Sequence, residues 1–461
     1  MIANKGLAAV IAVGVAGFVP QAQAQQALPE AQQASPDACT PAVAEQATSA
    51  QGTKNLADRL AEKGLALSLS YTGEAASNLT GGLSQKTAYA GQVYVGADVD
   101  LGRVAGVTGG SLHVAVTNRH GPSLSNIALG NNTSVQEIWG TQNTHLAILT
   151  YEQKLLHGAV DIEAGKSQAN IHFLTSPLYC NFQSNSTCGN PTMVFKDSNF
   201  TYFPASSWMA KVKLTVARDW FAHVGIYEVN PNRKAPDDNG FSLSFKGGTG
   251  FIVPFELGYG STYATARLPR HVILGGWVDR GTYADPLRDA SGGIAALSGR
   301  APAMLKGRSG LYLRFDQVLT RPDPNSQRGL AVFGVAMANI SGRVEESHYF
   351  DLGLVQTGTW RGRDEDTIGF VINDQHFSDL AMARMNALRV AAGGRPDAHR
   401  DEIMMELAYG AQVNRALRVS PNVQYVLHPD SSGAPLRAGS IPNAWVVGIK
   451  FTVDAMRLLP R

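Results

Sequence analysis

The sequence predicts an all-β chain that closes into one antiparallel outer-membrane β-barrel of about 16 strands, preceded by a short N-terminal helix. Three observations support this prediction: an export-type N-terminus, apolar residues that recur with a period of two, and no later apolar run long enough for a spanning helix. Lys and Arg total 39 against 37 Asp and Glu. This near-neutral balance argues against a basic binding surface, so we expect no nucleic-acid partner.

Residues 1–24 have the layout of a secretory signal peptide. Lys5 supplies a positive start, residues 7–19 form an apolar run, and Ala22-Gln23-Ala24 offers a small-x-small cleavage site. The run is too short to span a bilayer, which needs about 20 apolar residues. The alternative is a buried N-terminal helix. We therefore expect an exported chain that enters a membrane only as strands.

Two short segments precede the predicted barrel. Residues 25–52 are rich in Ala, Gln, Ser, Thr and Pro, and we expect a flexible leader there because such a segment buries too little apolar surface to become ordered. A short amphipathic helix follows within residues 53–64, where Asn55 can cap its start and Gly64 can end it. Its simplest role is a terminal plug on the body of the protein.

From residue 65 onward the apolar period changes from 3.6 to two, which is typical of strands. In residues 65–71, Leu and Tyr alternate with Ala and Ser. In residues 445–453, Trp, Val, Ile and Phe alternate with Val, Gly, Lys and Thr. We expect the barrel to occupy residues 65–455, which would supply about 16 strands at about 25 residues per strand and connection. Residues 456–461 would remain as a C-terminal tail.

Alternation alone does not separate a membrane barrel from a secreted β-sandwich, whose inner faces are also apolar. Three features favour the barrel. Several strands would be about 9–11 residues long, the length of a tilted membrane strand, and their polar faces carry Gly, Ser, Lys, Glu and Gln, as a wet interior requires. Aromatic residues near the expected strand ends would form interfacial girdles: Tyr71, Trp220, Phe221, Tyr227, Tyr259, Trp360, Tyr425 and Trp445.

The three cysteines allow one short cross-link. Cys180 and Cys188 flank a polar loop, and an oxidising compartment would let them form a disulfide that stiffens this loop. The alternative is that both remain thiols. Cys39 lies in the leader and has no evident partner in the sequence.

The common local signatures of enzymes are missing from the sequence. It contains no Gly-x-Ser-x-Gly, no His-Glu-x-x-His and no Cys-x-x-Cys, and the Gly-rich residues 247–250 run into a strand instead of a helix. His113, His120, His145 and His172 are scattered without the spacing of metal ligands. We therefore expect no enzyme activity, no cofactor and no metal site.

Several segments, in order along nearly the whole mature chain, resemble the carbohydrate-selective porins of the OprB family. The first begins Leu56-Ala-Asp-Arg-Leu-Ala-Glu-Lys-Gly and continues to Gly82. The others lie at residues 118–121 (Asn-Arg-His-Gly), 174–180, 274–277 (Leu-Gly-Gly-Trp), 310–317, 420–429 and 443–454.

The resemblance implies an outer-membrane barrel of about 16 strands with a periplasmic N-terminal extension, and passive diffusion of glucose-like sugars and polyols as its activity. Its partners would be small carbohydrates, outer-membrane lipid and the barrel-insertion machinery, and a homo-oligomer is compatible with the pattern. The chain departs from the usual pattern at its end, because it runs past Phe451 to Arg461 instead of finishing on an aromatic residue. The alternative is a plugged barrel or a secreted β-sandwich that binds sugar without channel activity.

A sugar that crosses a pore exchanges water for charged and amide groups, while aromatic rings cover its apolar faces. We expect such groups on the polar faces of strands or in loops that fold inward, and mixed charges would favour neutral polyols over ions. Arg119 and Lys166 stand out, because each lies where a strand gives way to a Gly-rich or polar loop. The predicted pore-lining, substrate-binding residues are Arg119, Glu152, Lys166, Lys211, Lys213, Trp277, Arg314, Glu406 and Gln424.

Overall fold

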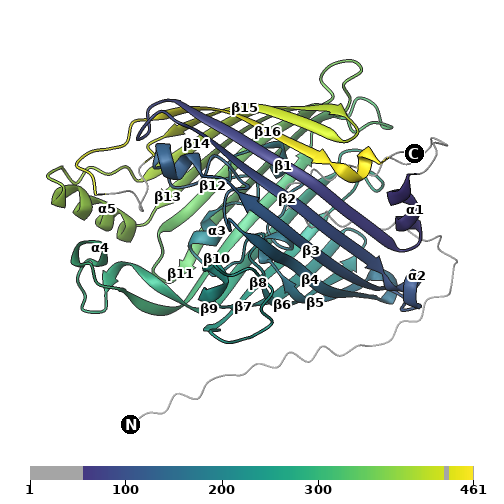
Figure 1. The fold of residues 1–461 in the computed structure, drawn as a ribbon, viewed down its shortest axis with the longest axis horizontal. Coiled ribbons are helices and arrows are strands. Elements are labelled where there is room, and N and C mark those ends of the chain that lie inside the picture. Colours follow the sequence, from purple (N-terminus) through teal and green to yellow (C-terminus); the bar gives the residue numbers. More distant parts are fainter. Residues whose placement is uncertain (1–54, 430–435, 460–461) are drawn as a thin grey trace, which may run out of the picture. The chain divides into compact units, whose positions relative to one another are not determined.

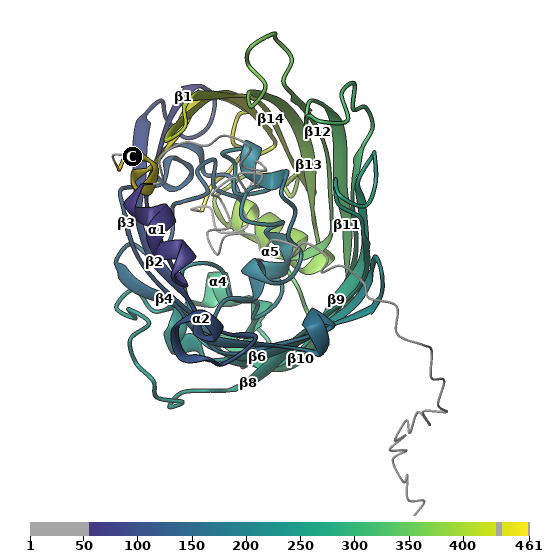
Figure 2. The same ribbon diagram turned by 90° about the vertical axis from the view of Figure 1, so that its right-hand side faces the viewer.

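A computed structural model describes residues 55–429 and 436–459. In it, 16 antiparallel strands form one closed barrel, in which sequence neighbours pair and β16 pairs with β1 (Figures 1 and 2). The predicted closed all-β barrel is therefore confirmed. The strands are β1 (Leu65–Thr80), β2 (Thr87–Asp100), β3 (Gly110–His120), β4 (Thr144–Leu155), β5 (Val160–Ser167), β6 (Ser207–Ala217), β7 (Trp220–Val229), β8 (Gly250–Gly260), β9 (Arg270–Asp289), β10 (Pro302–Val318), β11 (Gly329–Ser341), β12 (Glu346–Thr357), β13 (Thr367–Phe377), β14 (Asp401–Asn414), β15 (Leu417–Leu427) and β16 (Ala444–Asp454).

Short helices lie at the ends of strands and within loops. The N-terminal helix α1 (Leu56–Glu62) falls inside the predicted range 53–64. Its Asn55 side chain accepts from the Asp58 backbone N–H at 2.8 Å, and the Asp58 side chain accepts from the Asn55 N–H at 2.9 Å, which forms a capping box. The remaining helices are α2 (Leu101–Ala105), α3 (Met193–Lys196), α4 (Ala295–Ser298), α5 (Asp379–Ala391), η1 (Ser125–Leu129), η2 (Leu156–Gly158), η3 (Ala169–Ile171), η4 (Tyr179–Asn181), η5 (Pro231–Lys234) and η6 (Ala455–Leu458).

None of the helices in the described part of the chain is long and apolar enough to cross a membrane. The predicted signal peptide (1–24) and leader (25–52) lie outside the described residues. Within the predicted tail, the described residues continue the single turn η6, which the Asp454 side chain caps by accepting from the Met456 N–H at 3.0 Å.

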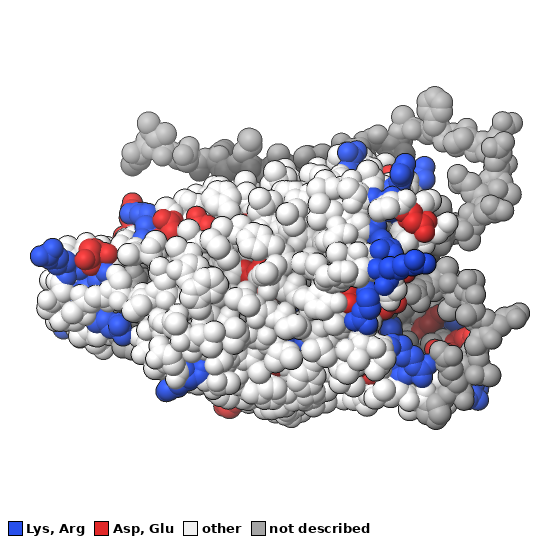
Figure 3. Space-filling view, turned by 90° about the horizontal axis from the view of Figure 1, so that it is seen from above, with Lys and Arg blue, Asp and Glu red and all other residues white. Residues whose placement is uncertain are grey.

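Alternation along each strand gives the barrel two chemically different faces. On β14, Glu402, Met404 and Glu406 are buried on the inside, whereas Leu407 is exposed on the outside. On the surface drawn in Figure 3, charged side chains concentrate toward the two ends, and few occur in the band between them. An apolar outer band of this kind is what lipid requires of a membrane-spanning barrel.

Aromatic residues mark an edge of this band, although two of the predicted ones do not. Trp220 packs edge-on against Tyr259, with their ring centroids 5.4 Å apart, where β7 begins and β8 ends. Tyr227 is completely buried inside the barrel, and Phe221 packs against the same internal cluster. The reason is parity: odd-numbered residues of β7 face inward, so the girdle assignment of these two residues was wrong.

The connections at the two ends of the barrel differ in length. At one end, the turn end, the connections have at most ten residues, as at residues 156–159, 218–219 and 319–328. At the other end, the loop end, residues 121–143 and 168–206 fold back into the barrel (Figure 2). We call these two segments the first and second inner loops. Since outer-membrane barrels carry their longer connections outside the cell, the loop end is the extracellular one.

The inner loops build an internal core against the barrel wall. Phe173, Met193 and Phe200 of the second inner loop pack with Tyr227 and Trp277 of the wall in one buried cluster. Burying large apolar side chains in this way is worth roughly 1.5–3 kcal/mol each, which stabilises the loops inside the barrel. The polar groups of the interior are therefore arranged around packed loops.

Candidate functional site

Buried carboxylates of the barrel wall hold the inner loops in place. Glu406 on β14 accepts hydrogen bonds from the backbone N–H groups of Gln183 and Ser184, at 2.7 and 2.8 Å. Such partners are needed because an isolated buried charge is costly. Four other wall carboxylates accept an inner-loop N–H in the same way: Glu74 from Ile138, Glu256 from Leu174, Asp279 from Asn199 and Glu402 from Asn132. We call these carboxylates the loop anchors.

Gln424 on β15 also binds an inner loop. Its side-chain amide donates to the Val135 carbonyl at 3.1 Å, and the neighbouring Asn422 donates to the side-chain oxygen of Gln183 at 2.8 Å. Glu406 and Gln424 thus point inward, as predicted for pore-lining residues, but protein groups of the two inner loops occupy the hydrogen-bonding positions named here.

Trp277 on β9 and Arg314 on β10 also point inward, yet they lie beneath the second inner loop. Trp277 is completely buried and stacks with Tyr312 at a centroid distance of 6.5 Å. Arg314 is buried and pairs with Asp316 at 2.7 Å. Both residues therefore brace the wall on which the loop rests.

A second polar region, nearer the turn end, carries charges of both signs on the inner faces of β2–β6. Glu152 lies 3.7 Å from His113, and the Lys211 ammonium lies 3.1 Å from the Glu163 carboxylate. Lys213 is half-buried beside them. Within residues 55–429 and 436–459, no group of three or more His, Cys, Asp or Glu is arranged to hold a metal ion. We call this region the charge ladder: Asp98, His113, Glu152, Asp161, Glu163, Lys211 and Lys213.

Arg119 on β3 is buried where the two inner loops meet the wall. Its Nε donates to the side-chain oxygen of Gln92 at 2.6 Å, and its guanidinium lies 3.6 Å from Glu137 of the first inner loop. The same group lies 5.5 Å from the ring centroid of Phe203, in the second inner loop. A planar guanidinium held on several sides is fixed in one orientation, so Arg119 joins the two loops.

Lys166 does not line the interior, and its assignment as a pore residue was wrong. It pairs in register with Leu149 and Trp208, whose side chains face outward. Its ammonium is completely buried and donates to the backbone carbonyls of Gly240 and Ser242, the latter at 3.0 Å. The β7–β8 connection folds over the outer wall at this point, and its carbonyls replace the water that a lysine on this face would otherwise need.

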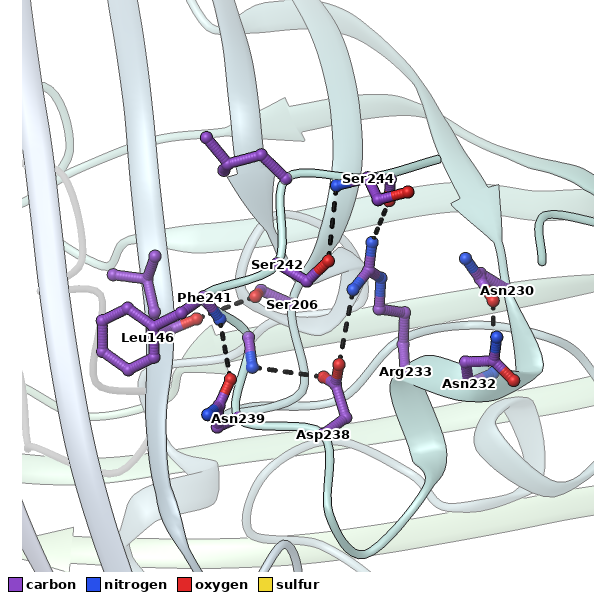
Figure 4. Close-up of polar contacts among 12 residues, drawn as sticks. Leu146, Ser206, Asn230, Asn232, Arg233, Asp238, Asn239, Phe241, Ser242 and Ser244 are labelled. Carbon is purple, nitrogen blue, oxygen red and sulfur yellow. Dashed lines mark hydrogen bonds and ion pairs between the residues drawn. The ribbon is translucent and has the colours of Figure 1, made fainter. Parts of the chain in front are cut away.

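Residues 239–246, which we call the strap, form the part of this connection that crosses β4, β5 and β6. Its first carbonyl accepts from the Leu146 N–H on β4 at 2.9 Å. Figure 4 shows how the strap is fixed near its base: Arg233 donates both to the Asp238 carboxylate, at 3.3 Å, and to the Ser244 carbonyl. The strap is thus part of the outer wall.

The predicted disulfide between Cys180 and Cys188 is not formed in the structure. The Cys188 side chain is buried and directed at β16, where its sulfur lies 3.4 Å from the Lys450 ammonium. Cys180 belongs to the single turn η4 of the same loop. This loop is held by its backbone contacts to Glu406 instead. Cys39 lies outside the described residues.

An aromatic and cationic group toward the loop end escaped prediction from the sequence. Phe195, on α3 inside the barrel, is 38% exposed and meets Tyr202 edge-on, with ring centroids 4.9 Å apart. The Lys234 ammonium lies 4.9 Å from the Phe195 ring centroid. We call these three residues the aromatic face. Nothing in their spacing indicates that they meet, because the contact depends on a long loop turning inward.

Lys234 carries a charge that can be titrated in a mildly alkaline solution. Surrounding protein, with Arg308 as a like-charged neighbour and Asp279 acting in the opposite direction, lowers the pKa of Lys234 to about 8. The side chain still meets solvent. The aromatic face therefore presents a cation at neutral pH and loses it above about pH 8.

Comparison with known proteins places this architecture in a family. The model of the family described as "Carbohydrate-selective porin, OprB family" matches residues 84–454. Porin B of Pseudomonas aeruginosa is 31% identical over 407 residues, which cover 85% of this chain and 88% of that protein. The high-pH structure of Pseudomonas putida OprB superposes with a TM-score of 0.77 at 30% identity, covering 86% of this chain and 95% of that one.

A low-pH structure of Pseudomonas putida OprB shares the fold, with a TM-score of 0.51 at 21% identity over 86% of this chain and 94% of that one. The family model spans most of the chain, and the Pseudomonas aeruginosa relative is matched along nearly its whole length. The chain belongs to the OprB family of carbohydrate-selective porins.

Proposed function

We propose that small neutral carbohydrates diffuse passively through this outer-membrane barrel, past the aromatic face and then along the charge ladder. The observation that carries the proposal is the aromatic face: a Phe195 ring that remains 38% exposed inside the barrel, with Tyr202 and Lys234 beside it. Apolar ring surface left open next to a cation matches a sugar, which has apolar C–H faces and a rim of hydroxyls.

Each member of the aromatic face has a distinct role in this mechanism. Phe195 and Tyr202 cover a ring face of the sugar, while the Lys234 ammonium donates to a hydroxyl in place of water. A single exposed face binds weakly, and weak binding is required because the solute must leave for conduction to continue.

The charge ladder supports neutral solutes over ions. The Asp98 carboxylate, which is 39% exposed, accepts from sugar hydroxyls, and the half-exposed Lys213 ammonium donates to them. Since the ladder carries charges of both signs, neither cations nor anions meet a uniform attractive wall. The sugar therefore exchanges one set of hydrogen bonds for another as it moves toward the turn end.

The other parts of the proposal come from the sequence. The signal peptide 1–24 is removed before Gln25, the leader 25–52 stays in the periplasm, and insertion machinery places the barrel in the outer membrane. A homo-oligomer is compatible with this proposal. We expect channel activity without catalysis, because the sequence carries none of the local enzyme signatures.

Swelling of liposomes that contain the refolded protein tests the proposal. We expect glucose to enter faster than a zwitterion of similar size, and a disaccharide to enter more slowly than glucose. Phe195→Ala should reduce the advantage of glucose over the zwitterion several-fold. Phe255→Ala is the matched control, because Phe255 has a similar exposure on the outer face, at 36%. Equal glucose and zwitterion rates in the wild type, or equal effects of the two substitutions, would contradict the proposal.

A further inference from the structure

The strap presents three large apolar side chains that the rest of the described chain leaves uncovered. Phe241, Leu243 and Phe245 are 51%, 54% and 65% exposed and alternate with serines. Carbonyl groups of the strap are turned toward the wall, where they accept from Lys166 and from the Trp208 indole. The apolar side chains of the strap therefore form an edge beyond the wall of the barrel, which we call the apolar edge.

The apolar edge continues into a row of outward side chains close to the loop end. Phe245 stacks on Trp208 of β6 at a centroid distance of 5.1 Å. Across β7 the row reaches Phe251, the second residue of β8, which is also exposed. The pairing of β8 with β9 then places Arg280 beside Phe251. Since neighbouring strands lie about 4.8 Å apart, the distance from Trp208 to Arg280 along this row is about 14 Å.

Cations without protein partners gather at this end of the row. Arg280 on β9, Lys306 on β10 and Lys246 at the end of the strap are all exposed. Among the residues that the structure describes, none of these three side chains has a hydrogen-bond or ion-pair partner. Glu228, the acidic residue opposite Phe251, is already engaged, because Asn230 donates to it at 2.9 Å and Arg233 lies 3.8 Å away. We call Lys246, Arg280 and Lys306 the basic patch.

We propose that the apolar edge and the basic patch together bind a phosphorylated lipid of the outer leaflet, with its acyl chains against the apolar edge and its phosphate on the basic patch. The chemistry of the two parts fits such a lipid. Arg280 offers a guanidinium fork that matches phosphate geometry, and Lys306 adds a second positive charge on the adjacent strand. Phe241, Leu243 and Phe245 offer apolar area at the level where acyl chains begin.

The location of the surface selects lipid over other occupants. The surface lies on the outer wall of a membrane-spanning barrel, at its extracellular end, where headgroups and acyl chains meet. A second copy of the chain would have to bring acidic groups to the basic patch and apolar ones to the strap. The apolar edge and the basic patch both lie outside the barrel, so this proposal does not depend on which solute the channel conducts.

Thermal unfolding of the full-length protein in a neutral detergent tests the proposal. The probes are diphosphoryl lipid A and phosphatidylcholine, each added at increasing concentration. We expect diphosphoryl lipid A to raise the Tm of the wild type, and the double variant Arg280→Gln/Lys306→Gln to need roughly tenfold more of this lipid for the same rise. Arg218→Gln is the matched control, because Arg218 is an exposed arginine at the turn end. It should respond as the wild type does.

A second variant separates the two halves of the site. Phe241→Ser/Phe245→Ser should weaken the response to diphosphoryl lipid A while leaving its dependence on Arg280 and Lys306 intact. Unchanged single-channel conductance would show that the variants are folded. An equal Tm rise with phosphatidylcholine, or an equal response of the double arginine–lysine variant and the wild type, would overturn the proposal. Self-association that Phe245→Ser abolishes would also overturn it, because the surface would then be an interface between copies.

Discussion

The loop anchors and the charge ladder are both sets of charged side chains on the inner wall, but they face different partners. Glu406, an anchor, is buried and accepts two backbone N–H groups from a loop. In the ladder, Lys211 pairs with Glu163 across neighbouring strands, whereas the side chains of Asp98 and Lys213 remain partly exposed to solvent. An inward-pointing charged side chain is therefore available to a solute only where no group of an inner loop occupies its hydrogen-bonding positions.

The largest effect should come from removing an anchor. In Glu406→Ala the N–H groups of Gln183 and Ser184 lose their acceptors, at a cost of about 1–3 kcal/mol for each buried group left unpaired. We expect a lower Tm, a second inner loop that separates from the wall, and a higher single-channel conductance with less discrimination between glucose and a zwitterion. Planar-bilayer recordings and liposome swelling measure these changes.

The control for this substitution is Glu406→Gln, which keeps an oxygen that can accept one of the two N–H groups. Its conductance should lie between those of the wild type and Glu406→Ala. Hydrogen exchange at Gln183 and Ser184 gives an independent reading, since both amides should exchange faster in Glu406→Ala. Unchanged exchange and unchanged conductance would show that Glu406 does not anchor the loop.

An intermediate effect should appear when the charge of the aromatic face is titrated. Lys234 has a pKa lowered to about 8, so it is positive below this pH and neutral above it. We expect the preference of the channel for chloride over potassium to fall as the pH rises from 6.5 to 9.5, and reversal potentials in a KCl gradient measure this preference. Lys234→Gln should behave at every pH as the wild type does at pH 9.5. A pH dependence that persists in Lys234→Gln would assign the titration to another group.

The smallest effect on transport should come from substituting Lys166. This substitution tests the contrast between the inner and outer faces, because Lys166 lies on the outer face. Lys166→Met removes the donor to the strap carbonyls of Gly240 and Ser242 and leaves the inner wall unchanged. We expect a lower Tm, with glucose entry and conductance within experimental error of the wild type. A clear loss of glucose entry in Lys166→Met would place this lysine in the solute path after all.

The strands could be predicted from the sequence, but most contacts of the candidate site could not. Apolar residues that recur with a period of two predict a strand with one face toward lipid. This pattern predicts the whole barrel, because every strand of the barrel contacts lipid. Parity along β5 puts Lys166 on the same face as Ile162 and Ala164, so its position outside the barrel follows from alternation. Its charge suggested the opposite, because the strap that covers it is a loop and has no periodic signal.

Glu406, Gln424 and Trp277 show a second limit of prediction from strand alternation. Their parity was right, since all three point inward, but the loops that cover them come from distant parts of the sequence. Phe195 and Lys234 belong to separate loops and meet only inside the barrel. No local pattern specifies such long-range contacts, so the solvent-facing part of the site had to come from the structure.

The seam between β1 and β16 has a consequence for how the chain could be cut and rejoined. The Asn55 side-chain amide donates to the Met456 carbonyl at 3.3 Å, although 401 residues separate them, so the two ends of the barrel sequence lie side by side at the turn end. A short peptide linker between these two ends would make the barrel chain circular. A circular permutant opened at another short turn, such as residues 218–219, would then keep all the strand pairs of the barrel.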